Sequence, residues 1–264
     1  MVFISELVSS IIIAIVQGLT EWLPVSSSGH LVLFEKLLGY TSGGLMFDVA
    51  LHFGTLMAVF VYFGGVIVDI IRDLLSGKWE TENGRLGLLI VVATIPAAVV
   101  GYLLRAVFEN AFISLGVVAM GFAVTGVFLI ISSLKFKDKR IAGHFGFGKA
   151  LLVGVAQIFA LFPGISRSGS TLGAGLLLGL KEKNAIKFSF LMSIPIIFGA
   201  NVLAIGNQTL PPNLIWATLV SFFVGLGAIH LLYKKILTNR KNLRWFGGYA
   251  LLLSIALGIW LLVR

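Results

Sequence analysis

The fold is decided by two interruptions of long apolar runs, Gln-Gly-Leu-Thr-Glu-Trp-Leu-Pro-Val-Ser-Ser-Ser-Gly-His at residues 17–30 and Gln-Ile-Phe-Ala-Leu-Phe-Pro-Gly-Ile-Ser-Arg-Ser-Gly-Ser-Thr at residues 157–171. The apolar arms that flank them, within residues 5–39 and 149–180, are each shorter than the about 20 residues that a helix needs to cross a bilayer. Each region is therefore predicted to be a re-entrant hairpin, which enters the membrane and returns to the same side.

Six longer apolar runs are predicted to be transmembrane helices. They are Leu45–Ile71, Leu86–Leu104, Phe112–Leu134, Ala185–Ile205, Leu214–Tyr233 and Trp245–Val263. Of the 264 residues, 58% are hydrophobic and only 12% are charged, which excludes a water-soluble globule. A membrane β-barrel is excluded as well, since its strands alternate apolar and polar residues. We expect an all-α polytopic membrane protein with six transmembrane helices and two re-entrant helical hairpins.

The two hairpin regions are copies of each other. A shift of 140 residues superimposes identical residues: Gln17 on Gln157, Ser26 on Ser166, Ser28 on Ser168 and Gly29 on Gly169. Three spans follow each hairpin, and a hairpin adds no net crossing, so the second copy starts from the opposite side of the membrane. An inverted-topology repeat is therefore predicted, with residues 1–134 as the first repeat and residues 135–264 as the second, in a single membrane domain.

Basic residues indicate how the chain is oriented. Most of the 20 Lys and Arg residues fall in four connections, at residues 72–85, 135–149, 181–187 and 234–244, all on one side of the predicted topology. Cytoplasmic loops carry such an excess. We expect both termini and the mouth of the first hairpin to face outside, with the second hairpin entering from the cytoplasm. The net charge of +9 then reflects orientation in a lipid bilayer and not binding to nucleic acid.

Glu21 and Arg167 are the charged residues within the two interruptions. Hairpins that enter from opposite faces and reach only part-way should meet near the middle, so one composite polar site is expected. At that depth an unpaired charge costs about 2.5 to 3.5 kcal/mol by insertion scales. One interpretation is an ion pair that locks the repeats together. The other, a functional site, is favoured by the serines, the histidine and the glycines around the pair.

The second interruption has the residue types of a phosphate site. Arg167 carries a planar guanidinium that matches phosphate oxygens. Gly164 and Gly169 favour exposed backbone N–H groups near the start of the following helix, where the helix dipole also attracts an anion. The run Ser-Arg-Ser-Gly-Ser-Thr at residues 166–171 is therefore predicted to hold phosphate.

The first interruption supplies a possible nucleophile and base. The chain has no cysteine, and a serine hydroxyl is a weak nucleophile until a base, commonly a histidine steered by a carboxylate, removes its proton. Ser27, His30 and Glu21 offer this set, and Ser27 and His30 are adjacent on one face if a helix starts there. Direct attack by His30, or by a water that His30 activates, is an alternative. A packed, non-catalytic histidine is another.

Four further polar residues receive supporting roles. Asp48 and His52 are one turn apart and are expected to form a pair within one helix, with lining the site or holding a divalent ion as alternatives. Gln17 and Gln157 are expected to brace the two loops by hydrogen bonds, although contact of Gln17 with a ligand is also open.

The motifs resemble those of the undecaprenyl-diphosphate phosphatase family, also called the bacitracin-resistance family. They are Gln17-x-x-x-Glu21, Leu23-Pro-Val-Ser-Ser-Ser-Gly-His30 and Pro163-Gly-Ile-Ser-Arg-Ser-Gly-Ser-Thr171, and the resemblance extends over essentially the whole chain. It implies a hydrolase that converts a C55 polyprenyl diphosphate to the monophosphate carrier lipid, outside the cytoplasmic membrane, in support of peptidoglycan synthesis.

The resemblance also assigns roles to residues. It places Glu21, Ser27, His30 and Arg167 in the catalytic positions. It gives Ser26, Ser166, Ser168 and Thr171 supporting contacts to phosphate or substrate, and the residue pattern adds Gln17 and Gly169 to the expected contacts. The family has Glu or Gln at the first acidic position, and Gln17 leaves one carboxylate in place of two. Family members are similar in depending on a divalent cation, so Mg²⁺ or Ca²⁺ is expected by resemblance, with its ligands unassigned.

A transporter is the alternative to an enzyme. Inverted repeats with broken helices that meet at the membrane midplane are typical of secondary transporters, so the chain could move a polyprenyl phosphate between leaflets, with or without hydrolysis. A carrier needs an anion site but no nucleophile, and the set of Ser27, His30 and Glu21 therefore favours the phosphatase. The oligomeric state is open, with a homodimer among the alternatives.

Overall fold

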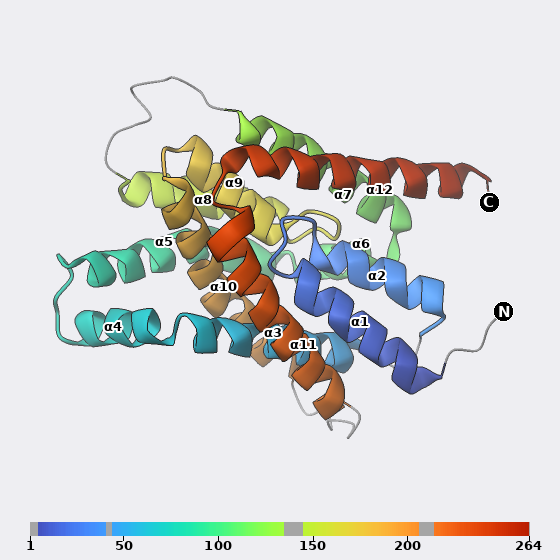
Figure 1. The fold of residues 1–264 in the computed structure, drawn as a ribbon, viewed down its shortest axis with the longest axis horizontal. Coiled ribbons are helices and arrows are strands. Elements are labelled where there is room, and N and C mark those ends of the chain that lie inside the picture. The colour runs from blue at the N-terminus through green and yellow to red at the C-terminus, as the bar shows by residue number, and fades with distance from the viewer. Residues whose placement is uncertain (1–4, 41–43, 135–144, 206–213, 264) are drawn as a thin grey trace.

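The computed structural model describes residues 5–40, 44–134, 145–205 and 214–263. Within these ranges the chain is helical almost throughout and no strand occurs (Figure 1). In chain order the helices are α1 (Glu6–Thr20), α2 (Ser27–Leu38), α3 (Gly44–Tyr62), α4 (Gly64–Leu75), α5 (Glu82–Leu103), α6 (Arg105–Ile113), α7 (Leu115–Ser133), α8 (Phe147–Phe159), α9 (Arg167–Leu177), α10 (Glu182–Ile205), α11 (Leu214–Leu231) and α12 (Leu243–Val263). A π-helical turn, Leu232–Ile236, and a 3-10 turn, Arg240–Asn242, lie between α11 and α12.

Six of the described helices are long and apolar enough to cross a membrane, namely α3, α5, α7, α10, α11 with the π-helical turn, and α12 with the 3-10 turn. They correspond to the six predicted spans. Large apolar side chains lie exposed on their outer surfaces, as at Phe223 on α11 and Leu252 and Ile255 on α12. An apolar exterior of this extent is expected where a protein faces lipid.

Two features differ from the predicted spans. The run Leu45–Ile71 is divided at Phe63, which lies between the end of α3 at Tyr62 and the start of α4 at Gly64. Gly64 and Gly65 follow this residue, and glycine has a low helix propensity. In addition, residues 105–113 form a separate helix, α6, whose last two residues, Phe112 and Ile113, belong to the predicted third span, while α7 begins only at Leu115. An exposed ion pair one turn apart, Arg105 Nε to Glu109 Oε1 at 2.6 Å, supports that short helix.

Both interruptions join two short helices into a hairpin. Residues 21–26 connect α1 to α2, and residues 160–166 connect α8 to α9. In Figure 1, α1 and α2 extend toward the side on which α12 ends, whereas α8 and α9 extend toward the opposite side. A serine N-cap starts the second helix of each hairpin. Ser26 Oγ accepts from Gly29 N at 3.2 Å, and Ser166 Oγ accepts from Gly169 N at 3.0 Å.

The tips of the two hairpins touch. Ser168 Oγ donates to the carbonyl oxygen of Leu23 at 2.9 Å, which confirms the predicted contact between the interruptions. Glycine makes the approach possible: Gly164 has φ +87°, and a Cβ there would lie 2.2 Å from the carbonyl oxygen of Val118 on α7. A Cβ on Gly29 would lie 3.0 Å from Gly164 Cα.

Helix α7 fixes the second hairpin through one side chain. Thr125 Oγ1 donates to the carbonyl oxygen of Gly164 and accepts from Ser166 N, both at 2.9 Å. Because both backbone groups are buried, they need such partners. The start of α9, and with it Arg167, is thereby held against α7.

Candidate active site

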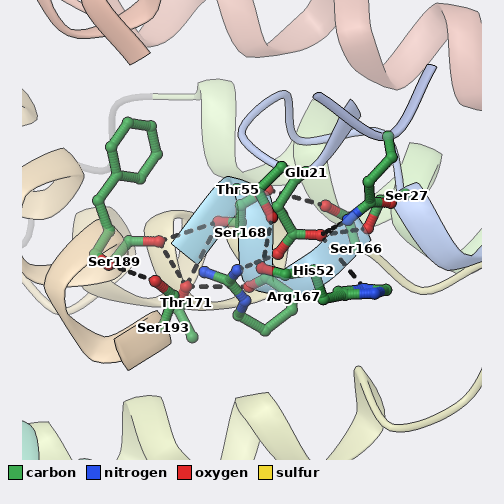
Figure 2. A network of polar contacts seen from close by, with 12 residues as sticks. Glu21, Ser27, His52, Thr55, Ser166, Arg167, Ser168, Thr171, Ser189 and Ser193 are labelled. Carbon is green, nitrogen blue, oxygen red and sulfur yellow. Dashed lines mark hydrogen bonds and ion pairs between the residues drawn. The ribbon is translucent and has the colours of Figure 1, made fainter. Parts of the chain in front are cut away.

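Glu21 is the centre of a buried polar network between the two hairpins (Figure 2). Its Oε1 forms an ion pair with Arg167 Nη2. Its Oε2 accepts from Ser27 Oγ at 2.7 Å and from Gln17 Nε2 at 3.0 Å, and His52 Nε2 lies 3.6 Å away. The side chains of Glu21 and Arg167 are 5% and 13% exposed. A carboxylate buried to this degree is stabilised by these donors, so the network accounts for a charge at this position.

Ser27 and Arg167 occupy equivalent places in the two hairpins. Ser27 is the first residue of α2 and Arg167 is the first residue of α9. Both helix N-termini, with their partial positive charge, therefore face the same site and favour an anion there. Ser26 precedes α2 with φ +69°, a conformation that a non-glycine residue rarely adopts. This turn sets the direction of the Ser27 side chain.

Arg167 has one guanidinium nitrogen left over for a ligand. Nη2 contacts Glu21, and the guanidinium carbon lies 5.7 Å from the centroid of the buried Trp22 ring. Nη1 is buried and has no hydrogen-bond partner among the described residues. The ion pair and the contact with the ring hold the side chain in place, while Nη1 can donate to an incoming oxygen.

His30 is not part of this network. Its Nδ1 donates to the carbonyl oxygen of Ser26 at 2.7 Å, and its Nε2 lies 2.8 Å from the hydroxyl of Tyr249 on α12. The Tyr249 ring stacks on the imidazole, with centroids 5.7 Å apart. The structure thus does not bring His30 to Ser27, whose hydroxyl donates to Glu21. The catalytic role of His30 stays a prediction, and its contacts hold the turn before Ser27.

Three hydroxyl groups of the second hairpin, those of Ser166, Ser168 and Thr171, have hydrogen-bond partners within the protein. Ser168 contacts Leu23, and Ser166 Oγ lies 3.2 Å from Ser168 Oγ. Thr171 Oγ1 donates to the carbonyl oxygen of Arg167 at 2.9 Å and lies 2.6 Å from Ser189 Oγ on α10. These contacts fix the hairpin around Arg167. The predicted phosphate contacts of these hydroxyls stay predictions.

A cavity of about 810 Å³ opens beside the network. Four residues of the predicted site line it: Glu21, Ser26, Ser27 and Arg167. Its other polar residues are Ser28, Glu35, Tyr40, Asp48, His52, Glu109, Gln157 and Asn201, and its apolar residues include Val32, Phe112, Ile196 and Ile197. Ser166 and Gly169 line a separate apolar pocket of about 300 Å³. The large cavity can hold a charged group beside Ser27 and an apolar chain along its other walls.

His52 and Glu35 belong to the site. Lining the site is one of the alternatives that the sequence leaves open for His52, whereas it does not single out Glu35. His52 Nδ1 donates to the backbone oxygen of Asp48 at 2.8 Å, so the expected pair exists through the main chain and Nε2 is left to face Glu21. The Asp48 carboxyl is hydrogen-bonded to that of Glu35. Burial raises the pKa of Glu35, and this outweighs the hydrogen bond from Asp48, which lowers it. The four-residue spacing of Asp48 and His52 is the only sequence feature that indicates this part of the cavity lining.

Of the two glutamines that were expected to brace the loops by hydrogen bonds, only Gln17 forms one among the described residues. Gln17 donates to Glu21 within the first hairpin. Gln157 does not brace the loops, because both atoms of its amide are buried and lack a hydrogen-bond partner among the described residues. The reason lies in the neighbouring position: one turn after Gln17 comes Glu21, whereas one turn after Gln157 comes the apolar Leu161.

The described residues do not form a protein cage for a metal ion. Among them, no group of three or more His, Cys, Asp or Glu side chains is arranged to hold one. Mg²⁺ is commonly bound through one or two carboxylates together with phosphate oxygens. A cation at this site would therefore need oxygens from a phosphate ligand in addition to those of the protein.

Comparison with known proteins points to one family. A family model described as bacitracin resistance protein BacA matches residues 10–256. Among the relatives, the undecaprenyl-diphosphatase of Thermosipho melanesiensis is 42% identical over 245 residues, 93% of this chain and 96% of the relative. The undecaprenyl-diphosphatase of Caldicellulosiruptor bescii is 41% identical over 261 residues, 97% of either chain. That of Methanococcus vannielii is 38% identical over 246 residues, 93% of this chain and 97% of the relative.

Proposed function

Because the chain belongs to the family of bacitracin resistance protein BacA, we propose that it is an integral membrane phosphatase that hydrolyses undecaprenyl diphosphate to the monophosphate carrier lipid and inorganic phosphate. One observation in the structure carries the proposal: Ser27 donates to Glu21 at 2.7 Å, Glu21 pairs with Arg167, and all three line one cavity. This arrangement supports Ser27 as the nucleophile, Glu21 as the base and Arg167 as the phosphate-binding cation.

The reaction follows from these contacts in two steps. The terminal phosphate lies at Ser27 and takes a hydrogen bond from Arg167 Nη1. Ser27 Oγ attacks the terminal phosphorus, its proton passes to Glu21, and the bond from this phosphorus to the bridging oxygen breaks, which releases the lipid monophosphate. Glu21 passes the first proton to the departing lipid monophosphate and is again a carboxylate. Water then attacks the phosphorus of the phosphoserine and gives a proton to Glu21, the bond to Ser27 Oγ breaks, and Glu21 returns that proton to Ser27 as phosphate is released. Arg167 and the two helix N-termini stabilise the charge that develops on the phosphoryl oxygens.

His30 acts on this reaction by positioning Ser27 through its contact with Ser26. It holds the carbonyl oxygen of Ser26, and Ser26 sets the direction of Ser27. His52 Nε2, which faces Glu21 at 3.6 Å, is the imidazole in reach of the proton that Glu21 accepts. Gln17 keeps the Glu21 carboxylate oriented. The hairpin that carries Arg167 is fixed by Ser166, Ser168, Gly169 and Thr171. Dependence on Mg²⁺ or Ca²⁺ is proposed from the family resemblance alone.

The topology is proposed on separate grounds. We infer that α1–α2 and α8–α9 are re-entrant and that residues 1–134 and 135–264 form an inverted repeat. In support, the four helices have 15, 12, 13 and 11 residues, about 16 to 23 Å at 1.5 Å per residue, against about 30 Å of hydrocarbon. The basic connections favour both termini and the site facing outside. Of these connections, residues 135–144 lie outside the described residues.

Phosphate release from the purified protein in detergent tests the enzyme against the carrier. Without a two-sided membrane a carrier has nothing to transport, so release of one phosphate per undecaprenyl diphosphate supports the phosphatase. Ser27→Ala should abolish release, and trapping of a phosphorylated Ser27 in the parent protein would identify the nucleophile. Translocation of polyprenyl phosphate in vesicles by a protein that releases no phosphate would favour the carrier. Full turnover by Ser27→Ala would eliminate Ser27 as the nucleophile.

A further inference from the structure

Three nitrogen atoms of residues that line the cavity have no acceptor among the described residues. Arg167 Nη1, Gln157 Nε2 and Asn201 Nδ2 are all buried, lack a hydrogen-bond partner among the described residues and belong to residues that line the cavity. Gln157 and Asn201 are 1% and 6% exposed. Buried polar groups in proteins nearly always have a partner, so three unsatisfied donors around one cavity indicate a ligand that is rich in acceptors.

The equivalent glutamines of the two hairpins differ in their hydrogen bonding, and of their amide nitrogens only that of Gln157 lacks a partner among the described residues. In the first hairpin Gln17 donates to Glu21, four residues on. In the second hairpin Leu161 takes the place of the glutamate, and the amide of Gln157 loses its local partner. Leu161 also lines the cavity, where it cannot form a hydrogen bond. The second hairpin therefore keeps the amide and lacks the group that engages it in the first.

We propose that Gln157 and Asn201 bind the inner phosphate of the diphosphate, the one that stays on the lipid. This assignment rests on the proposed phosphatase function. The terminal phosphate takes the place beside Ser27, because attack occurs there. The amide nitrogens of Gln157 and Asn201 form no hydrogen bond with Glu21 or Ser27, so we assign them to a group farther along the cavity. Arg167 pairs with Glu21 through Nη2 and also lines the cavity, and its Nη1 has no partner among the described residues and is available to a phosphate oxygen.

The surroundings of Asn201 agree with this order. Ile197 lies one turn before Asn201 on α10, and Ile196 and Ile197 both line the cavity. Apolar side chains next to the inner phosphate suit the first isoprene unit, which is attached to that phosphate. The amide oxygen of Gln157 is also buried without a partner and can accept from a protonated phosphate oxygen.

Gln157→Leu and Asn201→Leu test the proposal, because each removes the amide and keeps a side chain of similar size. Loss of a hydrogen bond to a charged acceptor should raise KM for undecaprenyl diphosphate roughly 10-fold or more in each variant. The inhibition constant of inorganic pyrophosphate, which spans both phosphate positions, should rise by a similar factor. That of inorganic phosphate, which needs only the terminal position, should stay unchanged.

Ser132→Ala is the matched control. Ser132 Oγ is likewise buried without a partner among the described residues, but it lies on α7 and does not line the cavity. Its removal should leave KM and the pyrophosphate constant unchanged. If Gln157→Leu does not fold, as judged by gel filtration and thermal unfolding, Gln157→Glu provides a second test. Its negative charge should weaken pyrophosphate binding more than tenfold while the size of the side chain is kept.

Binding without turnover separates this proposal from the proposed function. Stabilisation by pyrophosphate in thermal unfolding needs no hydrolysis, and it should be strong in the parent protein and weak in Gln157→Leu and Asn201→Leu. A parent protein that releases no phosphate would overturn the proposed function. A parent protein that turns over, together with folded variants that keep its KM and its pyrophosphate constant, would overturn the assignment of Gln157 and Asn201 alone.

Discussion

Replacing the two members of the Glu21–Arg167 pair, singly and together, separates a structural ion pair from a functional one. The side chains are 5% and 13% exposed, so Glu21→Gln leaves a buried guanidinium without its carboxylate and Arg167→Met leaves a buried carboxylate without its guanidinium. Breaking a buried ion pair costs about 3 to 5 kcal/mol. Since Ser27 and Gln17 still donate to Glu21, we expect about 3 kcal/mol for Arg167→Met, the lower end of that range.

The double variant should regain most of the stability that the single variants lose, but it should not regain their lost activity. With both charges gone, no uncompensated charge remains, so Glu21→Gln/Arg167→Met should recover to within about 1 kcal/mol of the parent. Its coupling energy in a double-mutant cycle should then be several kcal/mol. Activity should stay about 100- to 1000-fold below the parent in all three variants, because each lacks a charged group that acts on the phosphate.

Unfolding in mixed detergent micelles and kcat/KM for phosphate release are the two measurements. Asp69→Asn is the control, since the Asp69–Arg72 pair is 49% and 68% exposed and such surface pairs contribute at most about 1 kcal/mol. Recovery of both stability and activity in the double variant would show that the pair only joins the hairpins. Single variants as stable as the parent would show that Glu21 and Arg167 do not form a buried ion pair.

Four shorter predictions concern the parts around this pair. Gly164→Ala places a Cβ 2.2 Å from the carbonyl oxygen of Val118 at a positive φ, and thermal unfolding should show a loss of about 2 kcal/mol or more. Tyr249→Phe removes the partner of His30 Nε2 and should cost about 1 kcal/mol while kcat changes only a few-fold; a 100-fold fall in kcat at unchanged stability would instead place His30 in the chemistry. Burial raises the pKa of Glu35, so the folded protein binds a proton that the unfolded chain has released, and stability should fall as pH rises between the unfolded and folded pKa values. Glu35→Gln should flatten this dependence in unfolding measured at a series of pH values. Dialysis against a chelator should abolish phosphate release, and Mg²⁺ or Ca²⁺ should restore it; unchanged release would contradict the cation dependence expected from the family.

The sequence predicted the features that depend on composition and on repetition. Apolar run length was enough for the six spans, and the 140-residue offset was enough to expect contact between the tips, which the bond from Ser168 to Leu23 confirms. It did not predict the break at Phe63, because two glycines in an apolar run do not say whether a helix continues through them.

The partners of individual side chains were harder to predict, because they depend on how each helix is rotated. Spacing placed His30 next to Ser27, but α2 turns the imidazole toward Tyr249, which lies 219 residues away in sequence. The same rotation leaves Ser27 facing Glu21. Asp48 and His52 were seen as a local pair, whereas the position of α3 brings His52 Nε2 toward the carboxylate. Local spacing could not contain these long-range contacts.

The contact between His30 and Tyr249 has a consequence for how the protein is made in the cell. A ribosome produces α2 early and α12 only after more than two hundred further residues, so the turn before Ser27 lacks its stacking partner for most of translation. Insertion of the first half into the membrane therefore precedes completion of the nucleophile's surroundings. A nascent chain stalled before α12 would carry every residue that contacts Glu21 and still hold Ser26 and Ser27 less firmly than the finished protein does.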